Sequence, residues 1–239
     1  EAYAVASRSQ EKADKFAKEW KFAKAYGSYE ALVNDENVDL VYIATPHSEH
    51  YDNAMLCLNA GKPILVEKAF TACAWQAEEI IRVAHEKKIF VTEAIWTRYM
   101  PFSKTINDLA LSGFIGEPKV VTANLCYPNI DLPRMYRPEL AGGALLDLGV
   151  YTLNFAAMVF GTDIKSTVSS AIMTETGVDA SSSIILNYSD GRQAILTSSN
   201  LVKSDRHGII SGSKGHIVVD NINNPNHFDV YTDDYKLVR

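Results

Sequence analysis

The sequence has few cysteines and no excess of positive charge, and these two shortages exclude several classes of protein. Only three cysteines occur among 239 residues, Cys57, Cys73 and Cys126, and their wide, uneven spacing argues against a disulfide framework or a zinc site. Asp and Glu outnumber Lys and Arg by 29 to 23, so the formal net charge is −6. A nucleic-acid-binding protein needs a basic surface to displace counterions. We therefore expect a protein of a reducing compartment that holds no metal and binds no nucleic acid.

The sequence also lacks an uninterrupted apolar stretch of membrane-spanning length, which is about 18 residues. Its most apolar segment, residues 149–160, is interrupted by Thr152 and Asn154. The composition as a whole, with 47% apolar and 22% charged residues, is ordinary for a soluble globular protein. We expect a cytoplasmic protein that binds small neutral or polar molecules and no membrane.

A third absence concerns glycine. The pattern Gly-x-Gly-x-x-Gly, which holds the pyrophosphate of a dinucleotide in a Rossmann fold, does not occur. The chain has no initiator methionine, and residues 2–9 already have the pattern of a strand. Because a βαβ unit occupies about 30 residues, the loss of a first strand and helix would account for the missing glycines. If nothing is lost, we expect weak cofactor binding instead.

The first 94 residues alternate between the patterns of strands and helices. Short apolar runs predict strands at residues 2–9, 40–45, 64–66 and 89–94, and helical spacing predicts helices at residues 10–20, 29–34, 49–59 and 75–86. Such alternation predicts βαβ units and a parallel sheet, as in an α/β dinucleotide-binding Rossmann domain that lacks its first strand and helix.

The strand predicted at residues 64–66 ends at an acid and a base, Glu67 and Lys68. In open α/β sheets, ligands bind beyond the carboxyl ends of the strands. An ionisable pair placed there is therefore a candidate for contact with a cofactor, and Lys68 is also a candidate for chemistry. A solvated loop pair is the alternative that these residues leave open.

Two other strand ends carry candidate cofactor-binding residues. Ser7 and Arg8 lie at the end of the first strand, at the position that contacts the adenosine ribose in dinucleotide folds, where an arginine accommodates a 2′-phosphate. This favours NADP, with NAD possible, and the alternative is an exposed arginine without a ligand. The loop after the second predicted strand precedes a helix whose first N–H groups suit an anion. Its candidates are Thr45, Pro46, His47 and His50, although a loop histidine is often only a surface residue.

Beyond residue 98 the pattern changes to one helix followed mainly by strands. Pro101 suits the first position of a helix that stops at Ser112-Gly113. Alternating apolar residues flank an Asp190-Gly191 turn, and a second turn at residues 212–215 predicts another antiparallel hairpin. We therefore expect a Rossmann-like domain at residues 1–97 and an α+β domain with an open, largely antiparallel sheet at residues 98–239.

One segment of the second half departs from the strand pattern. Residues 142–151 run into a helix that extends to Phe160. Asp147 and Tyr151 lie four residues apart, so on a helix they share one face and can act on one small substrate. The glycines Gly142-Gly143 permit close approach of the backbone. The alternative is that Asp147 caps the helix and Tyr151 is a half-buried aromatic residue.

Three motifs, in order along the chain, resemble the glucose-fructose oxidoreductase, inositol dehydrogenase and rhizopine-catabolism protein (Gfo/Idh/MocA) family of oxidoreductases. Residues 66–70, Val-Glu-Lys-Ala-Phe, are similar to its Glu-Lys-Pro signature, with Ala69 in place of the proline. Residues 142–151 are similar to its Gly-Gly-Gly-x-Leu-x-Asp-x-Gly-x-Tyr/His segment. Residues 94–98, Ala-Ile-Trp-Thr-Arg, together with Tyr151, narrow the likeness to the branch that includes the dimeric dihydrodiol dehydrogenases.

The resemblance implies a domain that binds NAD or NADP and a second domain whose open sheet often forms a subunit interface. A homodimer or higher homo-oligomer is therefore expected. Carried over by residue, Lys68 matches the lysine beside the nicotinamide, Asp147 the family's acid and Tyr151 its acid/base. Trp96 and Arg98 would border the substrate pocket.

The chemistry implied is reversible hydride transfer between nicotinamide and a secondary alcohol of a sugar, cyclitol or dihydrodiol. A phenol has a pKa near about 10, and an ammonium group within about 4 to 6 Å lowers it. Lys68 would thereby prepare Tyr151 to accept the hydroxyl proton, while Asp147 holds the lysine or a substrate hydroxyl. Two alternatives stay open, namely a regulator that binds the dinucleotide without turnover and an inactive fragment of an active parent.

Overall fold

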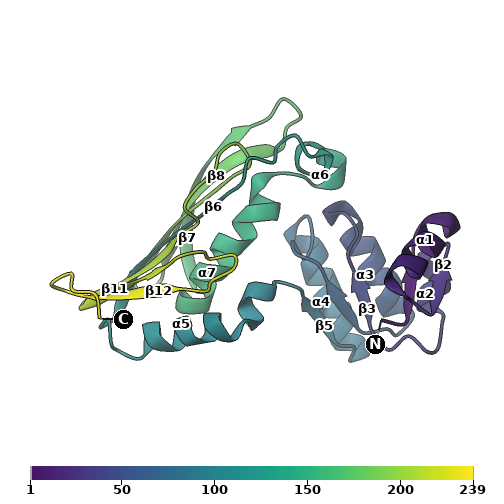
Figure 1. Cartoon of the computed structure of the whole chain (residues 1–239), viewed down its shortest axis with the longest axis horizontal. Coiled ribbons are helices and arrows are strands. Elements are labelled where there is room, and N and C mark those ends of the chain that lie inside the picture. Colours follow the sequence, from purple (N-terminus) through teal and green to yellow (C-terminus); the bar gives the residue numbers. More distant parts are fainter. Residues whose placement is uncertain (1, 239) are drawn as a thin grey trace. The chain divides into compact units, whose positions relative to one another are not determined.

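The computed structural model describes residues 2–238, which divide into two compact units between Ala94 and Ile95 (Figure 1). The sequence analysis expects this boundary between residues 97 and 98. Each unit has its own apolar core and is described by itself. The first unit carries the predicted dinucleotide-binding half, and the second carries the predicted antiparallel sheet.

The first unit alternates strands and helices, as the sequence pattern predicts. Its elements are β1 Ala4–Ala6, α1 Gln10–Trp20, β2 Lys24–Tyr26, α2 Tyr29–Val33, β3 Val41–Ile43, the 3₁₀ turn η1 His47–Glu49, α3 His50–Asn59, β4 Ile64–Val66, α4 Ala74–Lys87 and β5 Val91–Glu93. Serine caps begin two of the helices, because Ser9 accepts a hydrogen bond from the N–H of Lys12 (3.4 Å) and Ser28 accepts one from that of Ala31 (3.2 Å). The short strand β2 is not among the predicted elements.

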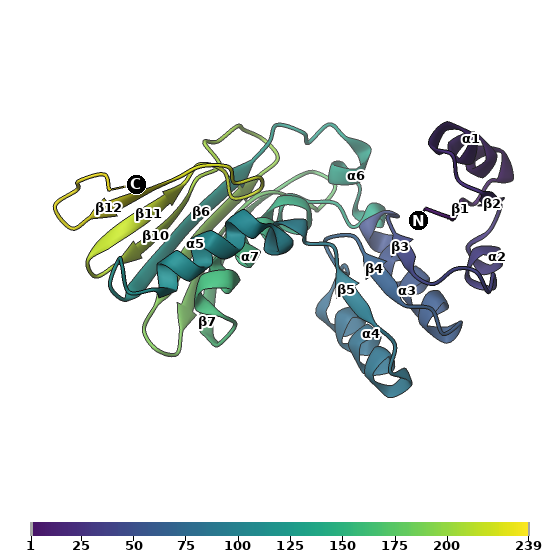
Figure 2. The ribbon, with the colours of Figure 1, turned by 60° about the horizontal axis from the view of Figure 1, so that its bottom comes forward.

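The strands of the first unit form two parallel sheets, where the sequence analysis predicted one. β1 pairs with β2, and β4 lies between β3 and β5, with α3 and α4 beside these strands (Figure 2). No strand within residues 2–238 joins β1 to β3. The pairing places Ile43, Val66 and Glu93 level with one another, so β3, β4 and β5 end at one edge. The candidate loops therefore emerge together at that edge.

The carboxylate of Asp35 connects the residue before β1 to both ends of β2. It is buried and accepts hydrogen bonds from the hydroxyls of Tyr26 (2.5 Å) and Tyr3 (3.1 Å) and from the N–H of Asn37 (2.9 Å). The ammonium of Lys24 lies 3.4 Å away. The Tyr26 hydroxyl, followed by the Asn37 donors, holds the pKa of Asp35 well below its usual range. Asp35 is therefore kept ionised as the centre of a structural network.

The second unit contains a seven-stranded sheet with the order β12-β11-β10-β6-β9-β8-β7, in which the β6–β9 pair alone is parallel among the described strands. Its elements are η2 Trp96–Tyr99, α5 Pro101–Leu111, β6 Pro118–Cys126, α6 Pro133–Tyr136, η3 Pro138–Leu140, η4 Leu145–Gly149, α7 Val150–Phe160, β7 Ile164–Met173, β8 Asp179–Tyr188, β9 Gln193–Ser199, β10 Gly208–Gly212, β11 Gly215–Val219 and β12 Phe228–Thr232. The β8–β9 and β10–β11 pairs confirm the two predicted hairpins.

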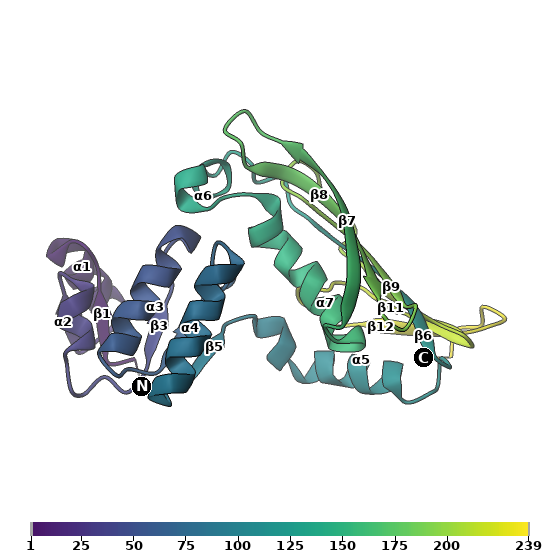
Figure 3. The ribbon, with the colours of Figure 1, turned by 180° about the vertical axis from the view of Figure 1, so that it is seen from behind.

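One face of this sheet is covered by α5 and α7 (Figure 3). Alternation along the strands separates the two faces: Ala194 and Leu196 in β9 are buried, whereas Ile195 between them is 41% exposed. Strand β7, at the edge, is exposed along its whole length. The fold thus confirms a largely antiparallel sheet with one open face.

Helix α7 belongs to a 23-residue apolar stretch, Pro138–Phe160, that is long and apolar enough, by length and composition alone, to cross a membrane. This corrects the sequence analysis, which considered only residues 149–160. The most apolar part of the stretch is 67% buried inside the protein. Such burial is typical of a core helix, and α7 packs accordingly against the covered face of the sheet.

Candidate active site

The loops that follow β3 and β4 are tied together by His50. Its side chain is fully buried, with Nδ1 2.8 Å from the carbonyl oxygen of Ala69 and Nε2 2.9 Å from that of Thr45. The structure thus places His50, a predicted cofactor-binding residue, as a brace between the two loops.

The other predicted residues of the β3 loop lie around this brace. Nε2 of His47 is 3.2 Å from the carbonyl oxygen of Lys68, and its ring lies edge-on to that of His50 at 5.6 Å. Pro46 directly precedes η1, and the hydroxyl of Thr45 accepts a hydrogen bond from Asn53 (3.1 Å). The structure therefore brings the two predicted loops together through contacts to backbone carbonyl groups.

Glu67 and Lys68 follow β4 directly, as predicted. The carboxylate of Glu67 accepts hydrogen bonds from the hydroxyl of Tyr42 and from the backbone N–H of Lys68 (3.1 Å). Burial, and then the neighbouring Glu67, raises the pKa of Tyr42 to about 12. Glu67 thus orders the loop that carries Lys68, and both side chains are half-buried.

Glu93, which sequence reasoning missed, supports the same loop. It ends β5 level with Val66 and accepts a hydrogen bond from the N–H of Phe70 (2.9 Å). Its position at the end of a predicted strand was the available signal. A carboxylate at the edge where three parallel strands end is a candidate site residue for the same reason as Glu67.

Ser7 and Arg8 lie where β1 ends. The N–H of Ser7 donates to the carbonyl of Tyr26 (3.0 Å), while the Arg8 side chain is exposed and makes no hydrogen bond or ion pair with the other residues that the structure describes. An exposed guanidinium beside a strand end fits the phosphate of a phosphorylated dinucleotide. Ser7 and Arg8 thus stay candidates for the ribose end of such a cofactor, and the sequence carries no Gly-x-Gly-x-x-Gly pattern for its pyrophosphate.

Asp147 and Tyr151 lie on one helical segment of the second unit, as predicted. The first turn, η4, is a π-helix, and α7 continues it from Val150. Both side chains are 7% exposed. Nη1 of Arg134 in α6 donates to Oδ1 of Asp147 at 2.8 Å. Sequence reasoning missed Arg134, because its pairing depends on the loop between α6 and η4.

The alternative reading of Asp147, as the cap of this helix, does not match the structure. The N–H of Leu145 donates instead to Oδ2 of Asp179 in β8, at 2.7 Å. Burial raises the pKa of Asp179, and the backbone donors oppose that effect. A Cβ on Gly143, whose φ is +117°, would lie 2.1 Å from Oδ1 of Asp179, so a glycine at this position leaves room for that carboxylate.

Trp96 and Arg98, the predicted substrate-pocket residues, both contact α7. The indole Nε1 of Trp96 lies 3.1 Å from the hydroxyl of Tyr151. Nε of Arg98 donates to Oδ1 of Asn154 (2.9 Å), whose Nδ2 donates to the hydroxyl of Thr97 (3.1 Å). Asn154 was noticed in the sequence only as an interruption of an apolar run. That interruption was the signal of a buried polar partner.

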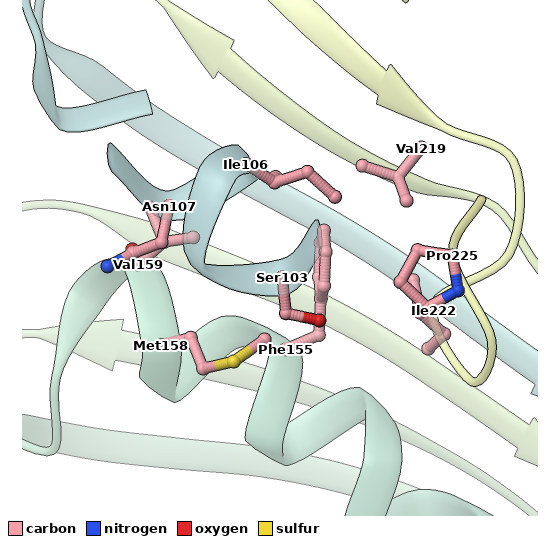
Figure 4. Close-up of a pocket in the computed structure, with 9 residues that line it drawn as sticks. All are labelled: Ser103, Ile106, Asn107, Phe155, Met158, Val159, Val219, Ile222 and Pro225. Carbon is pink, nitrogen blue, oxygen red and sulfur yellow. The ribbon is translucent and has the colours of Figure 1, made fainter. Parts of the chain in front are cut away.

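A small cavity of about 10 Å³ also lies in the second unit, between α5, α7 and β11 (Figure 4). Ser103, Phe155 and Met158 are among the residues that line it. A single water needs roughly 10–15 Å³ of such space, so this cavity does not accommodate a substrate. Within residues 2–238, no cluster of three His, Cys, Asp or Glu side chains is arranged to hold a metal ion.

Comparison with known proteins gives matches for both units. The family model for the oxidoreductase family with an NAD-binding Rossmann fold matches residues 1–94, and that for the GFO/IDH/MocA C-terminal domain matches residues 103–218. The chain is 40% identical over 217 residues to a trans-1,2-dihydrobenzene-1,2-diol dehydrogenase of Xenopus tropicalis, covering 90% of the chain and 66% of the relative. It thus spans slightly less than two thirds of that relative's length.

Two further relatives cover the same two units. A D-xylose 1-dehydrogenase (NADP(+)) of Hypocrea jecorina is 40% identical over 225 residues, covering 82% of the chain and 56% of the relative. The crystal structure of KijD10, a 3-ketoreductase from Actinomadura kijaniata in complex with NADP and TDP-benzene, superposes with a TM-score of 0.89 at 26% identity. That match covers 100% of the chain and 75% of KijD10.

Proposed function

Because the chain belongs to the Gfo/Idh/MocA family of oxidoreductases, we propose that it acts as an NADP-dependent dehydrogenase on a secondary alcohol of a sugar, cyclitol or dihydrodiol. The observation that carries this proposal is the helical segment with Asp147 and Tyr151. It presents a buried carboxylate paired with Arg134 and a phenol bonded to Trp96 within one stretch of five residues. The names of the dihydrodiol and D-xylose dehydrogenases support this class of substrate.

In this proposal Tyr151 moves the proton of the reaction. When bound, NADP⁺ would supply the hydride acceptor for oxidation of the alcohol to a carbonyl compound. Tyr151 accepts the hydroxyl proton and releases it to solvent, so alcohol and NADP⁺ yield ketone or lactone, NADPH and H⁺. Lys68 stabilises the phenolate electrostatically, and Asp147 orients the lysine or a substrate hydroxyl. In the reverse direction Tyr151 donates the proton.

The residues that would hold the cofactor belong to the first unit. Arg8 would bind the 2′-phosphate with Ser7 beside it, and Thr45, Pro46, His47, His50, Glu67 and Lys68 would shape the loops next to the rest of the dinucleotide. Arg8 supports NADP over NAD, because an exposed guanidinium pairs with a phosphate and gains nothing from a 2′-hydroxyl.

Titration with NADPH and, separately, NADH, followed by nicotinamide fluorescence, tests the cofactor assignment. We expect NADPH to bind more tightly than NADH. Arg8→Ser should weaken NADPH binding about 10-fold and leave NADH unchanged, because it removes one charge-assisted pair. Lys12→Ser on the exposed face of α1 is the matched control. Absence of binding by either nucleotide would refute a working dehydrogenase and favour an inactive fragment.

The activity itself is tested with NADP⁺ and two probe alcohols, D-xylose and trans-1,2-dihydrobenzene-1,2-diol. We expect turnover of at least one of these alcohols. Tyr151→Phe should lower kcat by a factor of about 10² to 10⁴ and leave the cofactor affinity unchanged. Tyr235→Phe, at a side chain that is 81% exposed, is the control. Tight cofactor binding without turnover of any secondary alcohol would instead identify a dinucleotide-binding regulator.

We also propose that two copies associate through the open face of the seven-stranded sheet. Val168, Ile185, Ile195, Ile209 and Val218 lie in one row across it, interrupted only by Thr122. Val168 is 59% exposed and Ile195 is 41% exposed, and an exposed, largely apolar row of this kind is typical of an interface between copies. Sedimentation should give a dimer or higher oligomer for the native chain and a monomer for Ile195→Lys. Val202→Lys, at an exposed loop residue, should not change the mass.

We also propose that the protein is cytoplasmic. All three cysteines are unpaired, and burial raises the pKa of the Cys57 thiol to about 12, which keeps it in its unreactive form. Unpaired thiols fit a reducing compartment. Fluorescent tagging of the full-length protein would test this location.

A further inference from the structure

The short segment η2, Trp96–Tyr99, is fastened to α7 by three hydrogen bonds between side chains. Trp96 donates to Tyr151 (3.1 Å), Arg98 donates to Asn154 (2.9 Å), and Asn154 donates to Thr97 (3.1 Å). Tyr151 and Asn154 lie three residues apart on α7 and therefore share one face of the helix. Three consecutive residues of η2 are thus in register with one turn of α7.

Burial makes this fastening rigid. Thr97 is 1% exposed and Asn154 is 8% exposed, so the bond between them is shielded from water. Polar groups in such surroundings are costly to leave without a partner, which holds the pair together. Because Thr97 directly follows Trp96, the backbone under the indole ring is fixed. The Trp96 residue is 42% exposed, and the N–H of its ring donates a hydrogen bond to the hydroxyl of Tyr151.

The direction of the Trp96–Tyr151 hydrogen bond follows from its chemistry. An indole nitrogen only donates, so the phenolic oxygen accepts and its own proton points away from Trp96. When the phenol ionises, the same N–H donates to a negative oxygen, and a charge-assisted bond is about twice as strong as a neutral one. The contact therefore favours the phenolate over the phenol.

We propose that Trp96 is a positioning residue for Tyr151. Its indole N–H fixes the phenolic oxygen and turns the O–H bond towards the hydroxyl group with which the proton is exchanged, while the Thr97–Asn154–Arg98 bonds fix the indole. This inference rests on the proposed dehydrogenase function and adds a role that differs from lining a substrate pocket. In this role η2 contributes to proton transfer, because its conformation positions the indole that orients Tyr151.

The first test does not depend on turnover. The absorbance of tyrosinate is recorded against pH for the native chain and for Tyr151→Phe, and the difference between the two curves isolates the titration of Tyr151. The same pair is recorded in a Trp96→Phe background. We expect the Tyr151 titration to move up by about one pH unit when the indole donor is absent. An unchanged midpoint would overturn the proposal.

The second test uses the probe alcohol that the native chain oxidises. Trp96→Phe should lower kcat about 10-fold near neutral pH and shift its pH profile upwards, with KM for NADP⁺ unchanged. Trp96→His, which keeps a ring N–H, should restore part of both effects. Trp20→Phe, at a tryptophan that is 62% exposed on α1, is the matched control. A loss of kcat without a pH shift and without rescue by histidine would also overturn the proposal.

The two tests separate failure of this inference from failure of the proposed function. If Tyr151→Phe keeps full turnover, Tyr151 is not the acid/base, whatever the titration of its phenol shows. If Tyr151→Phe is inactive and Trp96→Phe behaves like the native chain, the function stands and the positioning role falls. Thermal unfolding of each variant by circular dichroism identifies any loss that reflects misfolding.

Discussion

The two units surround two of their half-buried carboxylates, Asp35 and Asp179, in opposite ways. In the first unit, Asp35 is surrounded by hydroxyl, amide and ammonium donors, and these keep its pKa far below the usual range. In the second unit, burial raises the pKa of Asp179, although its carboxylate accepts the N–H of Leu145. The first arrangement stabilises the ionised carboxylate, whereas in the second burial disfavours the charge.

Asp35 and Asp179 also differ in where they lie relative to the proposed site. Asp35 connects Tyr3, just before β1, to Lys24 and Tyr26, the first and last residues of β2. Asp179 caps the helical segment that carries Asp147 and Tyr151, and Asp147 itself is buried with a half-exposed arginine as its ion-pair partner. Carboxyl groups whose surroundings work against their charge are characteristic of sites that move protons. The comparison therefore separates Asp35, the centre of a structural network, from Asp179, a carboxyl group that adjoins the proposed site.

Exchanging the carboxylates for amides gives the largest expected effect. Asp147→Asn should lower kcat about 10²- to 10⁴-fold, because it removes a charge from the proton-transfer site while keeping the size of the side chain. Asp35→Asn should leave kcat within a factor of about two at temperatures where the variant stays folded. Steady-state kinetics with the probe alcohol measures both. A fully active Asp147→Asn variant would remove the distinction between the two residues.

Local signals in the sequence predict much of the fold on which this comparison depends. The predicted helix 10–20 coincides with α1, the predicted strand 64–66 coincides with β4, and Pro101 begins α5. Each has its signal within a few residues, namely the Ser9 cap, a bounded apolar run and a proline at the first helical position. The Asp190-Gly191 hairpin is of the same kind. Such elements need no knowledge of distant contacts.

The parts that sequence reasoning missed depend on residues far apart in the chain. Strand β2 has only three residues, the first of them an exposed lysine, and exists through its pairing with β1. Arg134 meets Asp147 across 13 residues, and Asn154 meets Thr97 across 57. The candidate residues themselves were predictable because strand ends and the resemblance to a family mark them. Their partners were not, because the fold alone determines which donor reaches which acceptor.

A smaller effect is expected on stability, and its dependence on pH tests the low pKa of Asp35. A carboxylate whose pKa is depressed in the folded state stabilises the fold above its unfolded pKa of about 3.9, and this contribution is lost as the pH falls through the folded value. Asp35→Asn should therefore unfold at a lower temperature than the native chain at pH 7. The gap should narrow as the pH is lowered below about 4.

Thermal melts of both chains between neutral and acidic pH measure this gap, with Asp39→Asn at an exposed carboxylate as the control. A gap of constant size would mean that the Asp35 network is held by the shape of the side chain and not by its charge. That outcome would weaken the contrast between the two units, because the fold would then not stabilise the ionised form of Asp35.

The smallest effect is expected at Asp179, and its sign should be opposite. Burial raises the pKa of this group in the folded state, so its stabilising contribution is present below the unfolded pKa and is lost as the pH rises through the folded value. Asp179→Asn keeps an oxygen that can accept the N–H of Leu145 and removes the charge that burial disfavours. Relative to the native chain, this variant should therefore gain stability as the pH rises from about 4 to about 7. The same melts, read at each pH, compare it with Asp35→Asn. If the difference in melting temperature between variant and native chain changes with pH in opposite directions for Asp35→Asn and Asp179→Asn, the two carboxylates are in opposite electrostatic environments. If both differences change in the same direction, the fold stabilises the ionised form of Asp179 as it does that of Asp35.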